Sequence, residues 1–283
     1  MWTWMAIGSA LLLGVYDVAK KKALGHNSPL WVLLGATVLS TLIMAPFFTS
    51  GAPEDHLRLV LKAALVSSSW ITGMLGLKYL PITTVSTIKG ARPMVIIVFS
   101  MILFGERLGP WQWAGVLLIL AALMLLARSS RKEGIDVRND RGILYMVISV
   151  LTGAASALYD KHILMGMDAV FVQCWSNLYI SAVMALCLLV KWLWGRAREA
   201  GEAEIFHWDW TLVLIAALIT VSDFLYFHAL QQEGAMISVI SMLRRCSIAV
   251  TFIIGAILFK ENRIREKAGE ILMILAGAAM LLV

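Results

Sequence analysis

The sequence predicts an all-α membrane protein of ten transmembrane helices, built as two inverted repeats of five helices each. Hydrophobic residues make up 60% of the chain and charged residues only 15%, whereas globular domains average about 45–50% apolar and about 25% charged residues. Windows of about 18 or more mostly apolar residues, enough to cross a hydrocarbon layer of about 30 Å, recur along the whole chain. The second half also repeats the residue pattern of the first.

Ten apolar windows define the predicted helices, and only short connections lie between them. The windows are 3–19, 30–49, 60–77, 82–103, 110–127, 142–159, 169–190, 210–230, 236–258 and 268–283. We expect 3–19 to be a retained helix, because no basic n-region or A-x-A cleavage site accompanies it. The cysteines lie inside predicted helices without CxxC spacing, which indicates neither a disulfide framework nor a metal site.

The internal repeat is defined by residues that match at a fixed offset of 155 positions. Matching pairs include Ser86 with Ser241, Lys89 with Arg244, Val95 with Val250, Phe104 with Phe259 and Glu106 with Glu261, and at offset 143 Tyr16-Asp17 with Tyr159-Asp160. Each repeat has an odd number of crossings, so the second enters the membrane from the opposite side. Inverted repeats are typical of secondary transporters, which place the substrate near the midplane between the repeats.

Several short motifs in each half recur in the order and spacing of a known transporter family. The first half contains Leu77-Lys78-Tyr79-Leu80-Pro81, Pro93, Phe104-Gly105-Glu106-Arg107-Leu108 and Trp111-Gln112-Trp113-Ala114-Gly115. The second contains Ala229-Leu230, Ser238 to Ser241 and Leu258-Phe259-Lys260-Glu261, but has Arg245-Cys246-Ser247 in place of the proline and Glu270 in place of Gly115.

The pattern resembles the drug/metabolite transporter superfamily, in particular its ten-helix members made of two EamA domains. The resemblance implies a first domain over 1–127, a basic loop over 128–141 and a second domain over 142–283. It also implies transport by alternating access without covalent chemistry. The substrates of the family range from amino acids to sugar phosphates.

The distribution of basic residues predicts the orientation of the chain. Of the 24 Lys and Arg, sixteen follow helices 1, 3, 5, 7 and 9, whereas four, Arg58, Lys62, Arg107 and Lys161, lie on the opposite side. Because cytoplasmic loops carry the excess of positive charge, we expect both termini outside. Members of the family usually have cytoplasmic termini, so this expectation departs from what the resemblance implies.

The remaining four cations, Lys89, Arg92, Arg244 and Arg245, lie well inside predicted helices 4 and 9. A cation at such a depth costs about 2.5–3.5 kcal/mol on insertion scales and normally faces a cavity or a partner. One interpretation is pairing with buried carboxylates, and the other is an anion-binding cavity, since arginine offers a bidentate fork to phosphate or carboxylate. In the related plastid sugar-phosphate translocators, basic residues of helices 4 and 9 hold the substrate phosphate. That resemblance implies substrate binding by Lys89, Arg244 and Arg245, with Tyr226 as a further contact, and Arg92 is a candidate for the same site by its position.

Other polar residues inside the helices are candidates for coupling or for lining the cavity. Candidates for coupling or a polar cavity are Tyr16, Asp17, Tyr159, Asp160, Asp223 and Asn177, and Trp70 is a candidate substrate contact. Asp17 and Asp160 could bind a proton or a substrate amine. For Asp17 the alternative is simple pairing with Lys20 and Lys21 at helical spacing.

Together these features predict a secondary transporter that moves a small anionic metabolite, phosphorylated or carboxylated, by alternating access. The alternative is a proton-coupled exporter of amino acids or drugs that uses Asp17, Asp160 and Asp223. An enzyme is not expected, because the chain has no HExxH, GxSxG or clustered metal ligands. We expect no cofactor, metal or nucleic acid, a small solute and the lipid bilayer as partners, and a second copy as a potential homodimer partner. The expected location is the bacterial inner (plasma) membrane.

Overall fold

The computed structural model describes residues 1–25, 27–79, 88–89, 91–130, 140–197, 206–259 and 264–282, and within these ranges it contains helices and no strand. The helices are α1 (Trp2–Ala23), α2 (Pro29–Met44), the 3₁₀ helix η1 (Ala45–Phe47), α3 (Pro53–Tyr79), α5 (Arg92–Phe104), α6 (Pro110–Ser130), α7 (Asp140–Leu164), α8 (Ala169–Ala197), α9 (Thr211–Gln231), α10 (Ile237–Arg245), α11 (Ser247–Phe259) and α12 (Ile264–Leu281).

Six described helices are long and apolar enough to cross a membrane, namely α1, α2, α3, α7, α8 and α9, and shorter apolar helices lie at Arg92–Phe104, Pro110–Leu125 and Ile271–Leu281. Local signals explain several helix starts, because proline at the first helical position needs no N–H partner. Pro29, Pro53 and Pro110 each begin a helix, and Glu54 and Asp55 follow Pro53 in the first turn of α3. An all-helical membrane protein, as the sequence predicts, is therefore confirmed.

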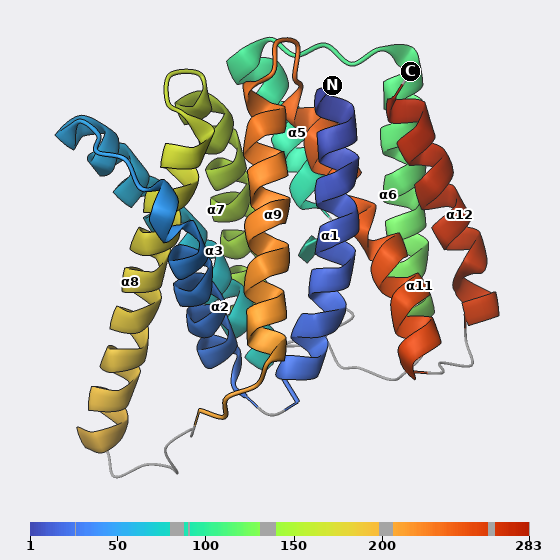
Figure 1. Ribbon diagram of the computed structural model, residues 1–283. Coiled ribbons are helices and arrows are strands. Elements are labelled where there is room, and N and C mark those ends of the chain that lie inside the picture. The colour runs from blue at the N-terminus through green and yellow to red at the C-terminus, as the bar shows by residue number, and fades with distance from the viewer. Residues whose placement is uncertain are drawn as a thin grey trace.

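The closest packing joins helices from different halves of the sequence. Helix α1 packs along α9, α3 packs along α7, and α6 packs along α12, while α2 contacts both α8 and α9. Figure 1 shows both termini at the same end of the bundle. The core therefore lies between the halves of the chain, and a site in the core draws residues from both.

Glycines allow the closest approach of α6 and α12. A Cβ atom at Gly115 would lie 2.6 Å from the carbonyl oxygen of Gly277, and one at Gly277 would lie 2.6 Å from Ile119 Cγ1. Small residues at a helix interface let two backbones approach within van der Waals contact, which is a main source of helix association in lipid.

The prediction of a continuous helix over 236–258 is wrong. Helix α10 ends at Arg245, Cys246 occupies a turn, and α11 begins at Ser247. The Cys246 N–H donates to the Leu243 carbonyl at 2.9 Å, which closes the last turn of α10. A break of one residue leaves the hydropathy of the window unchanged, so the apolar pattern cannot reveal it.

Several helices extend beyond their predicted ends. Helix α3 begins at Pro53 instead of residue 60, α6 continues to Ser130, and α7 begins at Asp140. The loop predicted over 128–141 is therefore shorter, and its middle lies outside the described residues. Four cations were assigned to the side of the membrane where both termini are expected. Arg58 and Lys62 lie within α3 and Lys161 lies within α7, so only Arg107 of these four lies in a connection between helices.

Candidate functional site

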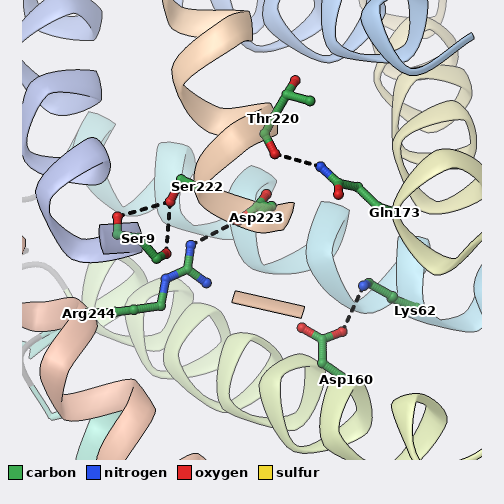
Figure 2. A network of polar contacts seen from close by, with 8 residues as sticks. All are labelled: Ser9, Lys62, Asp160, Gln173, Thr220, Ser222, Asp223 and Arg244. Carbon is green, nitrogen blue, oxygen red and sulfur yellow. Dashed lines mark hydrogen bonds and ion pairs between the residues drawn. The ribbon is translucent and has the colours of Figure 1, made fainter. Parts of the chain in front are cut away.

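An ion pair between α9 and α10 forms one side of the candidate site. Arg244 Nη2 lies 2.9 Å from Asp223 Oδ1, and the Arg244 guanidinium carbon lies 4.1 Å from the centroid of the Tyr226 ring. Asp223 and Tyr226 are one helical turn apart on α9, so both face the same side. Arg244 is thus held by a carboxylate and an aromatic face at once, and Figure 2 shows the contact with the carboxylate of Asp223.

Two serines link α1 to α9 next to Asp223. Ser9 Oγ lies 2.9 Å from Ser222 Oγ, and the Ser222 hydroxyl also donates to the Ser9 carbonyl at 3.0 Å. Both serines are buried. Because Ser222 directly precedes Asp223, this contact between α1 and α9 positions the carboxylate that binds Arg244 (Figure 2).

Arg92 lies against α7. Its Nη2 donates to the carbonyl oxygen of Gly153, and a Cβ atom at Gly153 would lie 2.5 Å from the Arg92 guanidinium carbon and 2.6 Å from Ser69 Oγ. The glycine is therefore needed for the arginine to reach this position. The charges of Arg244 and Asp160 act on Arg92, which places it in the same electrostatic region as the pair on α9 and α10.

Lys89 and Arg245 are the cations of the region that lack a direct partner. Both are half-buried, and within the part of the chain that the structure describes neither makes a hydrogen bond or an ion pair. The charges of Lys20, Arg245, Arg92 and Asp17 act on Lys89, and those of Arg92, Arg244 and Asp17 act on Arg245. The four cations of predicted helices 4 and 9 thus share one region, which we call the cation cluster.

Asp17 belongs to the same region from the side of α1. Its side chain is exposed, it has no ion-pair partner among the described side chains, and it lies in the field of Lys20, Arg245 and Lys89. Tyr16 lies beside it on α1, with Lys20 Nζ 5.6 Å from the centroid of the tyrosine ring. The prediction that Asp17 has a functional role is not tested by these contacts.

A second ion pair, which the sequence analysis missed, joins α3 to α7. Lys62 Nζ lies 2.9 Å from Asp160 Oδ1, and both residues are buried. Pro53 followed by Glu54 is a helix-start signal. Starting the helix there would have placed Lys62 nine residues, about 13 Å, inside it. The charge distribution instead groups Lys62 with Arg58, Arg107 and Lys161 on one side of the membrane.

The remaining predicted residues lie outside the cation cluster. Trp70 packs with Ala63, Ile180 and Met184 where α3 meets α8. Tyr159 lines an apolar groove of about 610 Å³ formed by residues of α3, α5 and α7. Asn177 donates from Nδ2 to Ser40 Oγ at 2.9 Å, which links α8 to α2.

Among the described residues, no group of three or more His, Cys, Asp or Glu side chains is placed to bind a metal ion. Cys174, Cys187 and Cys246 are free thiols. The arrangement can instead hold a small charged solute, because it combines guanidinium and ammonium donors with an aromatic face.

Comparison with known proteins finds a transporter family that is similar to the first part of the chain. Residues 1–128 match the EamA-like transporter family, whereas no curated protein matches the chain. One solved structure, described as the crystal structure of a protein, matches with a TM-score of 0.82 over 99% of this chain and 95% of that chain, at 15% sequence identity. At that identity the likeness shows a shared fold. The match over residues 1–128 therefore relates this part of the chain to the EamA-like transporter family, part of the drug/metabolite transporter superfamily.

Proposed function

We propose that this chain is a secondary transporter that moves a small anionic metabolite, phosphorylated or carboxylated, across the membrane by alternating access. The observation that carries the proposal is the excess of positive charge in the cation cluster. The four cations Lys89, Arg92, Arg244 and Arg245 and the neighbouring Lys20 lie around two carboxylates, Asp17 and Asp223, which leaves an excess of three positive charges.

An anion would compensate this excess. Lys89 and Arg245 have no direct partner among the described residues, although a cation inside a membrane helix is costly unless it is paired or hydrated. Arg244 is already oriented by Asp223 and Tyr226 and still has further N–H groups to donate. A phosphate or carboxylate group placed between these side chains would accept charge-assisted hydrogen bonds from several of them.

The proposal also includes ten crossings and an inverted repeat, which backbone geometry supports. The Ala91 N–H donates to the Ile88 carbonyl at 3.0 Å, and at offset 155 the Cys246 N–H donates to the Leu243 carbonyl at 2.9 Å. Helix α5 covers 92–104 and α11 covers 247–259, which again differ by 155 at both ends. Helix α5 thus begins shortly after Lys89, and α11 begins at the equivalent distance after Arg244.

Helix packing supports the same symmetry. If the fourth helix of each repeat is counted as one crossing, the contact of α1 with α9 corresponds to that of α7 with α3, and both are extensive. The contacts of α6 with α12 and of α2 with α8 each join equivalent helices (Figure 1). Broken helices that meet between inverted repeats are where transporters of this plan bind their substrates.

Uptake into proteoliposomes tests the substrate class. Radiolabelled phosphorylated and carboxylated metabolites are compared for the wild type and for Lys89→Ala and Arg244→Ala. Arg58→Ala, which removes an equally positive but exposed side chain from α3, is the control. We expect both cluster variants to lose uptake of the transported anion while the control retains it. Unchanged uptake of every anion in both cluster variants would exclude anion binding by the cluster.

The alternative of a proton-coupled exporter of amino acids or drugs has one observation in its favour, the exposed and unpaired carboxylate of Asp17 in the described structure. Asp160 and Asp223, by contrast, are each held by a cation. Amines belong in the same uptake panel. Transport of an amine that Asp17→Asn abolishes and Lys89→Ala leaves intact would favour this alternative.

A further inference from the structure

The ion pair of Lys62 and Asp160 is more deeply buried than the pair in the cation cluster. The Lys62 side chain is 3% exposed and that of Asp160 is 10% exposed, whereas Arg244 and Asp223 are 19% and 28% exposed. Lys62 Nζ also lies 4.0 Å from the centroid of the Phe227 ring on α9. The pair therefore joins α3, α7 and α9 at the boundary between the halves of the chain.

The charges of this pair have little support beyond each other. Lys62 Nζ and Asp160 Oδ1 have no hydrogen-bond partner elsewhere in the described part of the chain. An ammonium has three N–H donors and a carboxylate about four acceptor positions, so most of this capacity is unused. A buried pair of this kind contributes little net stability, because desolvation offsets the attraction between the charges. Stability alone therefore does not account for the pair.

A buried acceptor without a partner in the described structure lies on α8. Gln173 Nε2 donates to the Thr220 carbonyl at 2.7 Å, and this bond fixes the orientation of the amide. Its buried Oε1 has no partner in the described structure. Figure 2 shows this oxygen turned to the side of the network where the Lys62 ammonium lies. The polar groups around the ion pair thus include one neutral acceptor, Gln173 Oε1, that no described donor uses.

Asp160 also lies within range of the proposed substrate site. The charged and titratable groups that act on it are Lys62 from α3, Arg92 from α5, Asp223 and Tyr226 from α9, and Arg244 from α10. Three of these groups are cations. An anion bound to Arg92 and Arg244 would weaken their hold on the Asp160 carboxylate and so favour its protonation.

We propose that Asp160 is a proton-coupling site and that Lys62 is its exchangeable counter-ion, an inference that rests on the proposed transport of an anion. Water on one side of the membrane donates a proton to the Asp160 carboxylate, which becomes a neutral carboxylic acid. The Lys62 ammonium is released and donates to Gln173 Oε1. On the other side the acid returns its proton to water and the ion pair forms again, so one proton crosses with each anion.

Proton binding at Asp160 is tested without any substrate. Infrared difference spectra of the purified protein in detergent are recorded between acidic and alkaline buffer, in H₂O and in D₂O. We expect a protonated carboxylic acid band in the wild type that is missing in Asp160→Asn. Since that variant leaves Lys62 as an unpaired buried cation and could fail to fold, the double variant Lys62→Gln/Asp160→Asn is measured as well. Asp55→Asn, an exposed carboxylate on α3, is the control.

Coupling is tested in proteoliposomes with inorganic phosphate as the probe, by exchange at equal pH and by accumulation under a gradient of one pH unit. One coupled proton can support an accumulation of up to about tenfold under such a gradient. We expect the wild type and Asp55→Asn to accumulate phosphate. The double variant should keep exchange but lose accumulation.

The outcomes separate the two proposals. Accumulation by the double variant, or a wild-type acid band that persists in Asp160→Asn, would overturn the proton site. Phosphate exchange by a wild type that shows no acid band would also remove the proton site, while anion transport would stand. A band lost in Asp160→Asn in a protein that exchanges neither phosphate nor any other anion would support the proton site and remove the anion.

Discussion

Glu106 provides the sharpest test of how the halves of the chain are held together. It lies in the connection between α5 and α6, and its buried carboxylate accepts hydrogen bonds from the Ile237 N–H at 2.6 Å and the Ser238 N–H at 3.1 Å, and from the Ser238 hydroxyl. The N-cap of α10, Met236, makes no side-chain cap bond. Glu106 therefore caps α10 from the other half of the sequence.

The substitution Glu106→Ala leaves two backbone donors and one hydroxyl without their acceptor. Loss of a helix cap costs about 0.5–2 kcal/mol, and a buried donor left unsatisfied costs about 1–3 kcal/mol. Because the contact couples several groups at one site, we expect a total of about 2–4 kcal/mol. Glu54→Ala is the matched control, since Glu54 lies exposed in the first turn of α3 and contributes only about 0.3–1 kcal/mol through the helix dipole.

The assay is thermal unfolding of the purified protein in detergent, followed by tryptophan fluorescence, which 11 tryptophans make sensitive. We expect Glu106→Ala to lower the melting temperature several times more than Glu54→Ala does. Glu106→Gln should lie between them, because the amide keeps one acceptor but directs an NH₂ group at a donor. Equal shifts for Glu106→Ala and Glu54→Ala would show that the contact does not hold α10.

Three further substitutions test single contacts. Gly277→Leu should lower the melting temperature markedly because no side chain fits against α6, whereas Gly269→Leu on the same helix meets open space; similar shifts would contradict the close approach. Gly153→Ala should displace Arg92 and strongly reduce phosphate uptake while the melting temperature falls only slightly. Uptake at the wild-type level would argue against a role for that arginine. Gly105 ends α5 at φ 65°, so Gly105→Ala should cost about 1 kcal/mol or more, seen as a lower melting temperature, and an unchanged one would contradict the strain.

The sequence predicted several features of the candidate site because they follow from local composition. Lys89 and Arg244 stand out as cations in apolar windows at repeat-equivalent positions. The structure places both in one region with Arg92 and Arg245, as described above. The break at Cys246 was not predicted, because a turn of one residue leaves the mean hydropathy of the window unchanged.

The ion pairs show most directly where sequence reasoning stops. Asp223 and Asp160 were both candidates for pairing with buried cations, yet the sequence could not assign a partner to either. The structure pairs Asp223 with Arg244 and Asp160 with Lys62, which are 21 and 98 positions apart in the chain.

By itself, the sequence determined the membrane class, the approximate positions of the helices and the presence of unusual charges within them. These properties depend on the composition of neighbouring residues. Because polar groups are costly in lipid, apolar windows and the charges inside them can be recognised from the sequence. The tertiary structure alone decided which charges meet. Each residue turns a helix by about 100° and advances it by 1.5 Å, so a contact between distant helices depends on their rotation and register, which only packing sets.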